Sequence, residues 1–132
     1  MQTPTIDLLA RASKLAGMSP VTSPTPNAND MAHHVAKALN FKTDVGFCAL
    51  QLAIENAQTL DRKQQDYGPK NISKHGITGV LVRMDDKLSR IENLLAKKDN
   101  TAQCESLEDS FLDLSNYSLI CVLLLRNQWP RT

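Results

Sequence analysis

The chain has 132 residues, of which 42% are hydrophobic and 22% charged; this suits one packed domain and excludes a fibrous or wholly disordered protein. The formal charge is +1, so general attraction to nucleic acid is not expected and any anion site must be local. The longest strongly apolar run, Leu119 to Leu125, is too short to cross a bilayer. The three cysteines show no CxxC spacing, and the first residues show no secretory signal pattern. Both observations predict a cytoplasmic protein.

The chain begins with a short predicted helix, Ile6 to Ala16, which Gly17 can cap. Pro, Ser, Thr and Asn then dominate residues 19–29, and Pro20, Pro24 and Pro26 disfavour a helix there. The pattern predicts three parts: an N-terminal helical arm over 1–18, a Pro-rich linker over 19–29 and a helical domain over 30–132.

Two helices are predicted next. Asn29 or Asp30 can cap the first, which we expect to end near Asn40. Thr43 or Asp44 can begin the second, which we expect to run to about Gln65. Their apolar residues recur at helical spacing: Met31, Val35, Ala38 and Leu39 in the first, and Phe47, Leu50, Ile54, Ala57 and Leu60 in the second.

Residues 66–79 contain so many breakers that we predict an ordered loop without a regular element: Gly68, Pro69, Asn71, Gly76 and Gly79. Lys70, Asn71, Lys74 and His75 can present hydrogen-bond donors to a phosphate or to the edge of a nucleobase. A solvated connector has the same composition, and no Walker A run is present. Tyr67 can stack on a base or pack internally.

Two further helices are predicted over 80–97 and 105–125. The first has one apolar face and one polar face. The second is apolar nearly all round in its C-terminal half, which is typical of a central, buried helix. Because no alternating apolar run of useful length occurs, the predicted fold class is an all-α bundle.

Carboxylates line one stripe of the last helix. Glu105, Asp109 and Asp113 are spaced by four residues, and Asn116 extends the stripe by another turn. Like charges at this spacing need a positive partner, for which two interpretations stay open. The partner is Mg²⁺, or it is the cationic set on the preceding helix, Arg83, Lys87 and Arg90.

Three runs between about Gln58 and Trp129 resemble the nucleotide modification associated domain 1 family, whose members are frequent in bacteriophage genomes and are regarded as relatives of MazG-like pyrophosphohydrolases. The runs are Asp66-Tyr67-Gly68 with Asn71; Val82-Arg83-Met84-Asp85-Asp86-Lys87 with Arg90 and Asn93; and Glu105-Ser106-Leu107-Glu108-Asp109 with Asp113 and Asn116.

The resemblance implies a MazG-like helical bundle that assembles as a homo-oligomer and holds a nucleotide with Mg²⁺ between helices. Carried over by position, the metal ligands are Asp86, Glu105, Asp109 and Asp113, of which the last three are also the catalytic residues. The expected substrate-binding residues are Tyr67, Lys70, Asn71, Arg83, Lys87, Arg90, Asn93 and Asn116. This chain has Arg90 and Asn93 where a MazG-like enzyme has a further carboxylate, which weakens metal binding and favours direct cation contacts to phosphates.

Three functions follow as expectations. The first is a Mg²⁺-dependent nucleoside triphosphate pyrophosphohydrolase, or a related protein of phage nucleotide metabolism in the host cytoplasm. The second is a phage protein that binds and sequesters a nucleotide without turnover. The third is a structural oligomerisation module whose charged stripes pair with each other. None of the three needs a membrane or a nucleic-acid partner.

Overall fold

The computed structural model describes residues 28–97 and 101–131, with the side chains of 28 and 101–105 left out. Its elements are α2 (Ala28–Ala38), α3 (Asp44–Tyr67), α4 (Lys70–Ser73), α5 (Gly76–Leu95) and α6 (Thr101–Leu125). These residues contain no strand, so the all-α prediction is confirmed. None of the helices in these ranges has both the length and the apolar character of a membrane span. The predicted N-terminal arm and nearly all of the linker lie outside the described residues.

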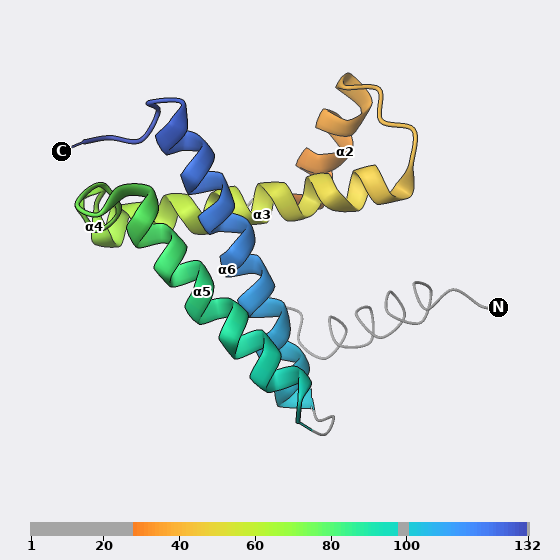
Figure 1. Ribbon diagram of the computed structural model, residues 1–132. Coiled ribbons are helices and arrows are strands. Elements are labelled where there is room, and N and C mark those ends of the chain that lie inside the picture. Colours follow the sequence, from red (N-terminus) through yellow and green to blue (C-terminus); the bar gives the residue numbers. More distant parts are fainter. Residues whose placement is uncertain (1–27, 98–100, 132) are drawn as a thin grey trace.

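The helices form an open arrangement (Figure 1). α5 and α6 run side by side as an antiparallel pair, and this pair crosses α3. α2 folds back against the N-terminal part of α3. The short α4 lies at the far end of α3 and packs against the start of α5.

Helix α3 begins at the predicted residue, Asp44, and ends at Tyr67, two residues after the predicted end. The Thr43 hydroxyl accepts a hydrogen bond from the backbone N–H of Gly46 at 3.0 Å, which satisfies one of the free donors of the first turn. Gly68 follows the helix with a φ of 68°, a conformation that glycine adopts at little cost. The chain therefore turns sharply out of α3 into the segment that carries α4.

The prediction that residues 66–79 contain no regular element is wrong. Lys70–Ser73 forms α4, and α5 already begins at Gly76, four residues before the predicted start. Gly76 has a φ of 59°, so one glycine makes the turn and the helix begins there. Gly79, which we expected in the loop, instead lies inside α5.

The main core cluster joins the segment after α3 to the end of α6 and the residues that follow it. It contains Ile72, Val80, Ile120 and Trp129, with Tyr117 and other half-buried apolar residues around it. The Trp129 indole N–H donates to the backbone carbonyl of Pro69 at 3.2 Å. The residues after α6 thus close over the turn between α3 and α4 and fix its position.

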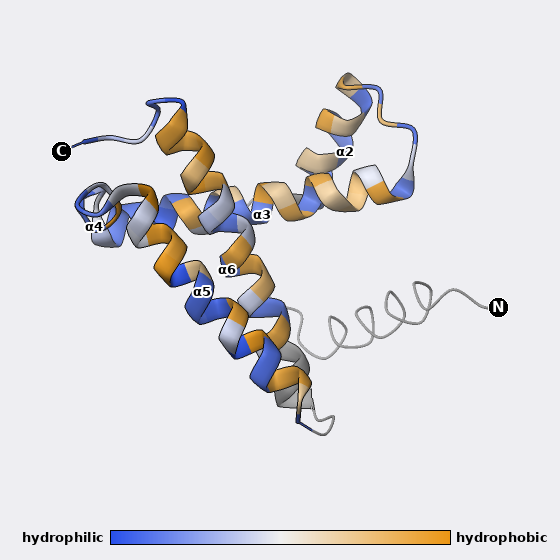
Figure 2. Cartoon of the chain, viewed as in Figure 1, coloured by the Kyte–Doolittle hydropathy of each residue, from blue (hydrophilic) through white to orange (hydrophobic). Residues whose placement is uncertain are grey.

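In α2 and α6 the buried residues differ from the prediction. α2 buries Ala32 and Ala36 and leaves Met31 and Leu39 exposed; small residues at a contact allow the backbones of two helices to approach closely. The C-terminal half of α6 is not buried all round: Leu119, Val122 and Leu125 are exposed, and apolar residues occur on its outward sides (Figure 2). The prediction of a central helix is wrong for this chain alone, because α3 and α5 do not surround α6.

Candidate functional site

A cleft of about 420 Å³ lies where α3, α5 and α6 meet, with α4 at one end. Its volume falls in the usual range for small-molecule sites, about 300–1,000 Å³. Its walls combine apolar, aromatic, amide and charged side chains, namely Leu60, Lys63, Gln64, Tyr67, Asn71, Ile72, Arg83, Lys87, Asp113, Asn116, Tyr117 and Ile120.

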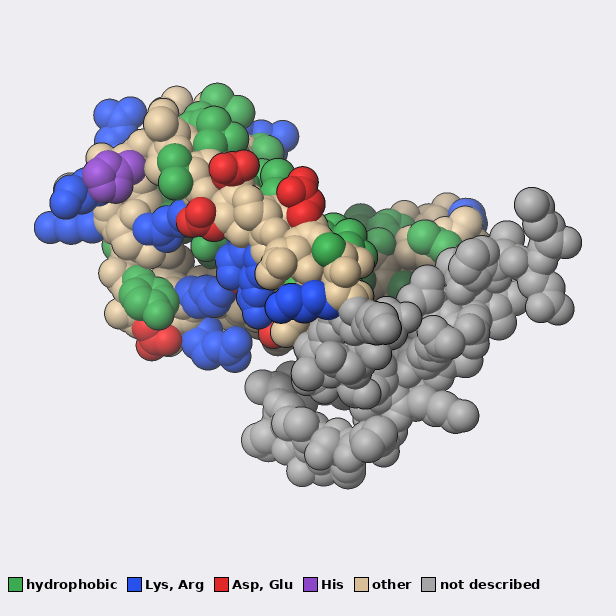
Figure 3. Space-filling model, turned by 60° about the horizontal axis from the view of Figure 1, so that its bottom comes forward, with side chains coloured by type: hydrophobic (Ala, Val, Ile, Leu, Met, Phe, Trp, Pro, Cys, Tyr) green, Lys and Arg blue, Asp and Glu red, His purple; other side chains and the backbone are tan. Residues whose placement is uncertain are grey.

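The charged side chains of this cleft are unbalanced. Lys63, Arg83 and Lys87 face a single carboxylate, Asp113. Lys87 Nζ lies 2.7 Å from one Asp113 oxygen, and Lys63 Nζ lies 3.3 Å from the other. One carboxylate cannot neutralise three cations, so the wall keeps an excess of positive charge. Figure 3 shows Lys and Arg side chains gathered on one face of the molecule, with acidic side chains along the border of the group.

The ion pairs decide the protonation state of Asp113. Burial by itself would raise the pKa of the carboxyl, but the hydrogen bond from Lys87 and the charges of Lys63 and Lys87 together outweigh burial and lower that pKa below its ordinary value of 3.8. Asp113 is therefore a carboxylate at neutral pH and an acceptor only. It cannot donate a proton to a leaving group in this state.

Two side-chain amides in the cleft wall have acceptors without a partner. The Oδ1 atoms of Asn71 and Asn116 are both buried and accept no hydrogen bond, and Asn116 is only 7% exposed. A buried polar atom without a partner costs free energy, roughly 1–3 kcal/mol. Asn56, a buried asparagine of α3 outside the cleft, donates its side-chain N–H to the Ser115 hydroxyl at 3.1 Å. The amide oxygens of Asn71 and Asn116 are therefore buried acceptors of the cleft residues that no described protein group satisfies.

Arg83 is held at the edge of the cleft by the segment before α5. Its Nη2 atom donates to the backbone carbonyl of Asn71 at 3.3 Å. A guanidinium carries five N–H donors, so one bond leaves others for an anion. This contact also ties α5 to α4 and keeps the positive charge pointed at the cleft.

Six of the residues that the sequence singled out come together in this cleft: Tyr67, Asn71, Arg83, Lys87, Asp113 and Asn116. Five others lie outside it, and their side chains are exposed: Lys70, Asp86, Arg90, Asn93 and Asp109. For three of these residues helix geometry explains the difference: Arg90 and Asn93 lie about two and about three turns along α5 from Arg83, and Asp86 is rotated by about 100° from Lys87. The side chain of Glu105 lies outside the described residues.

Sequence reasoning named Tyr67 at the end of α3 but missed the other α3 residues of the cleft. Lys63, Gln64 and Leu60 line the cleft, but nothing local distinguishes them from other residues of that helix. The available signal was the spacing of Lys63 and Tyr67, which places both on one face at the end of α3. Only the crossing of α3 with the α5–α6 pair brings Lys63 to Asp113.

The described residues do not fit the Mg²⁺ site that the resemblance implies. They contain no group of three or more His, Cys, Asp or Glu side chains that could hold a metal ion. Asp113, the one carboxylate of the cleft, is occupied by two lysines. Since Mg²⁺ prefers oxygen ligands and cations repel it, this wall is better suited to an anion.

The nucleotide modification associated domain 1 family model matches residues 63–125. The match confirms the resemblance predicted from the sequence and covers all the charged residues of the cleft, from Lys63 to Asp113. No curated protein matches the chain. No solved structure matches it either.

Proposed function

We propose that this protein binds a phosphorylated ligand, a nucleotide, in the cleft between α3, α5 and α6. The observation that carries the proposal is the excess of positive charge in a cleft that also contains unpartnered amides. The family match supports it through its name, which associates the domain with nucleotide modification.

The cations suit the phosphates. Lys87 and Lys63 contact different oxygens of the Asp113 carboxylate, and Arg83 keeps N–H donors free beyond its bond to Asn71. Lys63 is about half exposed, whereas Lys87 is about three-quarters buried. A phosphate that enters from solvent therefore meets Lys63 first and gains more from Lys87, where water screens the charge less.

The amides suit the uncharged part of the ligand. A phosphate at neutral pH offers acceptors, and the Oδ1 atoms of Asn71 and Asn116 need donors. Sugar hydroxyls and base N–H groups are such donors. A ligand that carries both phosphates and N–H or O–H groups thus satisfies the cleft better than inorganic phosphate does.

Binding without turnover is the form of the proposal that these residues favour. Asp113 is the one carboxylate among the cleft-lining residues, and two lysines hold it. Activation of a water molecule needs a free base or a metal, and the pairing leaves Asp113 poorly suited to either task. Mg²⁺-dependent hydrolysis stays a prediction from the resemblance, and the experiment below includes it.

The test is calorimetric titration of the full chain with the common ribo- and deoxyribonucleoside triphosphates, in EDTA and then in Mg²⁺, with recovery of the nucleotide for product analysis. We expect binding in EDTA and recovery of intact nucleotide. Lys63→Gln should weaken binding about three- to tenfold, the loss of one partly exposed charge contact. Lys74→Gln is the matched control, because Lys74 is exposed and does not line the cleft.

The outcomes separate the candidate functions. Equal effects of the two lysine variants would remove the cleft from the proposal. Turnover that needs Mg²⁺ would replace the binder with the pyrophosphohydrolase. A ligand that binds only the folded state must raise the apparent stability of that state. If no nucleotide gives a heat of binding or raises the melting temperature, the structural oligomerisation module is the function that remains.

A further inference from the structure

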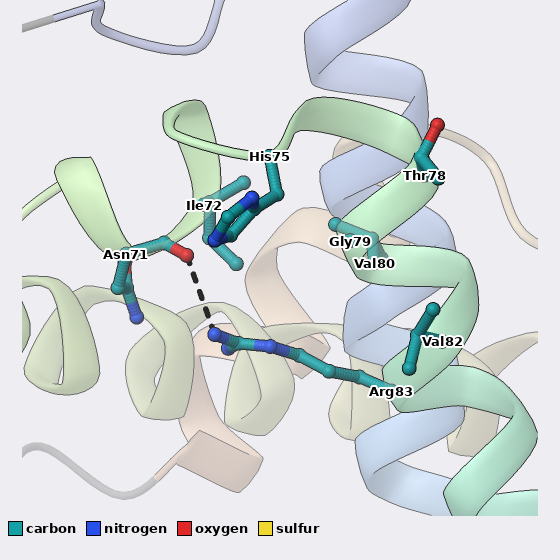
Figure 4. A pocket seen from close by; sticks show the side chains of 8 residues that line it. All are labelled: Asn71, Ile72, His75, Thr78, Gly79, Val80, Val82 and Arg83. Carbon is teal, nitrogen blue, oxygen red and sulfur yellow. Dashed lines mark hydrogen bonds between the residues drawn. The ribbon is translucent and has the colours of Figure 1, made fainter.

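A second cavity of about 410 Å³ adjoins the cleft and shares three lining residues with it: Asn71, Ile72 and Arg83. Arg83 stands between the two spaces and crosses from α5 toward Asn71 (Figure 4). The second cavity lies between α4 and the first turns of α5. The two spaces are therefore neighbours of similar size, with Arg83, Asn71 and Ile72 at their common border.

The chemistry of the second cavity differs from that of the cleft. Beyond the shared residues, its wall consists of Val80, Val82, Gly79, Thr78 and His75. It has no carboxylate and no lysine. Arg83 is its one guanidinium, and a guanidinium plane stacks on aromatic rings as well as binding anions. Such a wall suits a flat, largely apolar ring that carries a few polar edges.

His75 forms one side of the second cavity, and its position depends on Gly79. The imidazole lies near Ile72 and above the Arg83 side chain in Figure 4. A Cβ at Gly79 would lie only 2.5 Å from the Cβ of His75, so Gly79 permits His75 to pack against the first turn of α5. The turn between α4 and α5 therefore sets the position of the imidazole ring.

We infer that the second cavity binds the nucleobase of the ligand whose phosphates occupy the cleft, with Arg83 and Asn71 at the junction. The inference rests on the proposed function and adds which part of the nucleotide lies where. Asn71 lines both spaces, and its Oδ1 atom has no hydrogen-bond partner, so this side chain can accept from a sugar hydroxyl or a base N–H. The cleft holds both lysines, whereas the second cavity holds no lysine and no carboxylate; the phosphates therefore suit the cleft and the base suits the second cavity.

The experiment compares a base-free ligand with complete nucleotides. Tripolyphosphate and the four deoxyribonucleoside triphosphates are titrated into the full-length protein and into Val82→Trp. Val82 is 60% exposed and lines only the second cavity, so an indole there fills space without disturbing the core. Ser89→Trp is the control, because Ser89 is an exposed α5 residue that lines neither space.

We expect Val82→Trp to weaken the best nucleotide at least fivefold and to change tripolyphosphate affinity less than twofold, while Ser89→Trp changes neither. Unchanged nucleotide affinity in Val82→Trp would overturn the inference and leave the proposed function intact. Tripolyphosphate and nucleotides that both fail to bind the unmodified protein would overturn the proposed function itself. If Val82→Trp weakens both ligands equally, NMR spectra of the nucleotide bound to the unmodified protein decide between the two cases. Contacts between base protons and the Val82 methyl groups support the inference, and their absence refutes it.

Discussion

Asp113→Asn gives the most informative prediction, because removal of this carboxylate should tighten the binding of a metal-free anion. In the cleft, Asp113 is the one negative charge beside Lys63, Arg83 and Lys87. It pairs with both lysines, at 3.3 and 2.7 Å, and its lowered pKa keeps it charged at neutral pH. A phosphate in the cleft is repelled by this charge and competes with it for the lysines.

The size of the effect follows from Coulomb's law. For a phosphate charge about 6 Å from the carboxylate, the repulsion is about 0.7 kcal/mol in a water-like dielectric and about 2.8 kcal/mol at an effective dielectric of 20. Asp113 is 26% exposed, so a value near 1 kcal/mol is expected, or about fivefold in affinity. The same change should destabilise the fold by about 1 kcal/mol, since it removes charge-assisted hydrogen bonds that are partly exposed.

The assay is calorimetric titration with tripolyphosphate at low ionic strength in EDTA, where charge effects are least screened. Asp109→Asn is the matched control: it also removes one negative charge from α6, but Asp109 is exposed and does not line the cleft. We expect Asp113→Asn to bind more tightly than Asp109→Asn. Weaker binding by Asp113→Asn in EDTA would refute the reasoning, and a loss confined to Mg²⁺ would indicate that Asp113 serves a metal.

Three further predictions concern stability and assembly. Because the folded-state pKa of Asp113 is below 3.8, its contribution is present above that value and lost as the pH falls through the lowered pKa; the difference in melting temperature between the unmodified protein and Asp113→Asn should be constant above about pH 5 and shrink below about pH 4. Trp129→Phe keeps a ring in the core but removes the donor to Pro69, so urea unfolding should show a loss of about 1 kcal/mol, and equal stability would mean that this bond contributes nothing. Leu81, Leu88 and Leu95 are exposed at seven-residue spacing on α5, a stripe that a second copy can match with its own; light scattering should find a dimer or larger assembly that Leu88→Glu dissociates and Ser89→Glu does not, and a monomeric unmodified protein would contradict this.

Much of the secondary structure could be predicted because its causes are local. The Thr43 cap, the helical spacing of apolar residues and the breakers after Tyr67 each act within a few residues. The start of α5 was misplaced for an equally local reason: Gly76 and Gly79 indicate a break by composition, but a single positive φ at Gly76 makes the turn and Gly79 then adopts helical geometry.

The candidate site was predictable where its residues lie on adjoining elements of the matched region. Arg83, Lys87, Asp113 and Asn116 were recognised together from their pattern and resemblance, and the α5–α6 pairing brings them to one cleft. Asp86 and Asp109 belong to the same pattern but are exposed and do not line the cleft. Sequence spacing gives the angle of a side chain around its own helix and not the direction of the neighbouring helix, so it could not separate these two from the rest.

The sequence by itself determined an all-helical chain, most helix ends and the family resemblance of residues 63–125, because caps, periodicity and motifs are local in the chain. The tertiary structure alone decided that Lys63 meets Asp113 across 50 residues of sequence, that Trp129 closes over Pro69 and that α6 keeps an exposed apolar side. These contacts depend on how helices cross, and the crossing is set by the packing of whole faces rather than by any single segment.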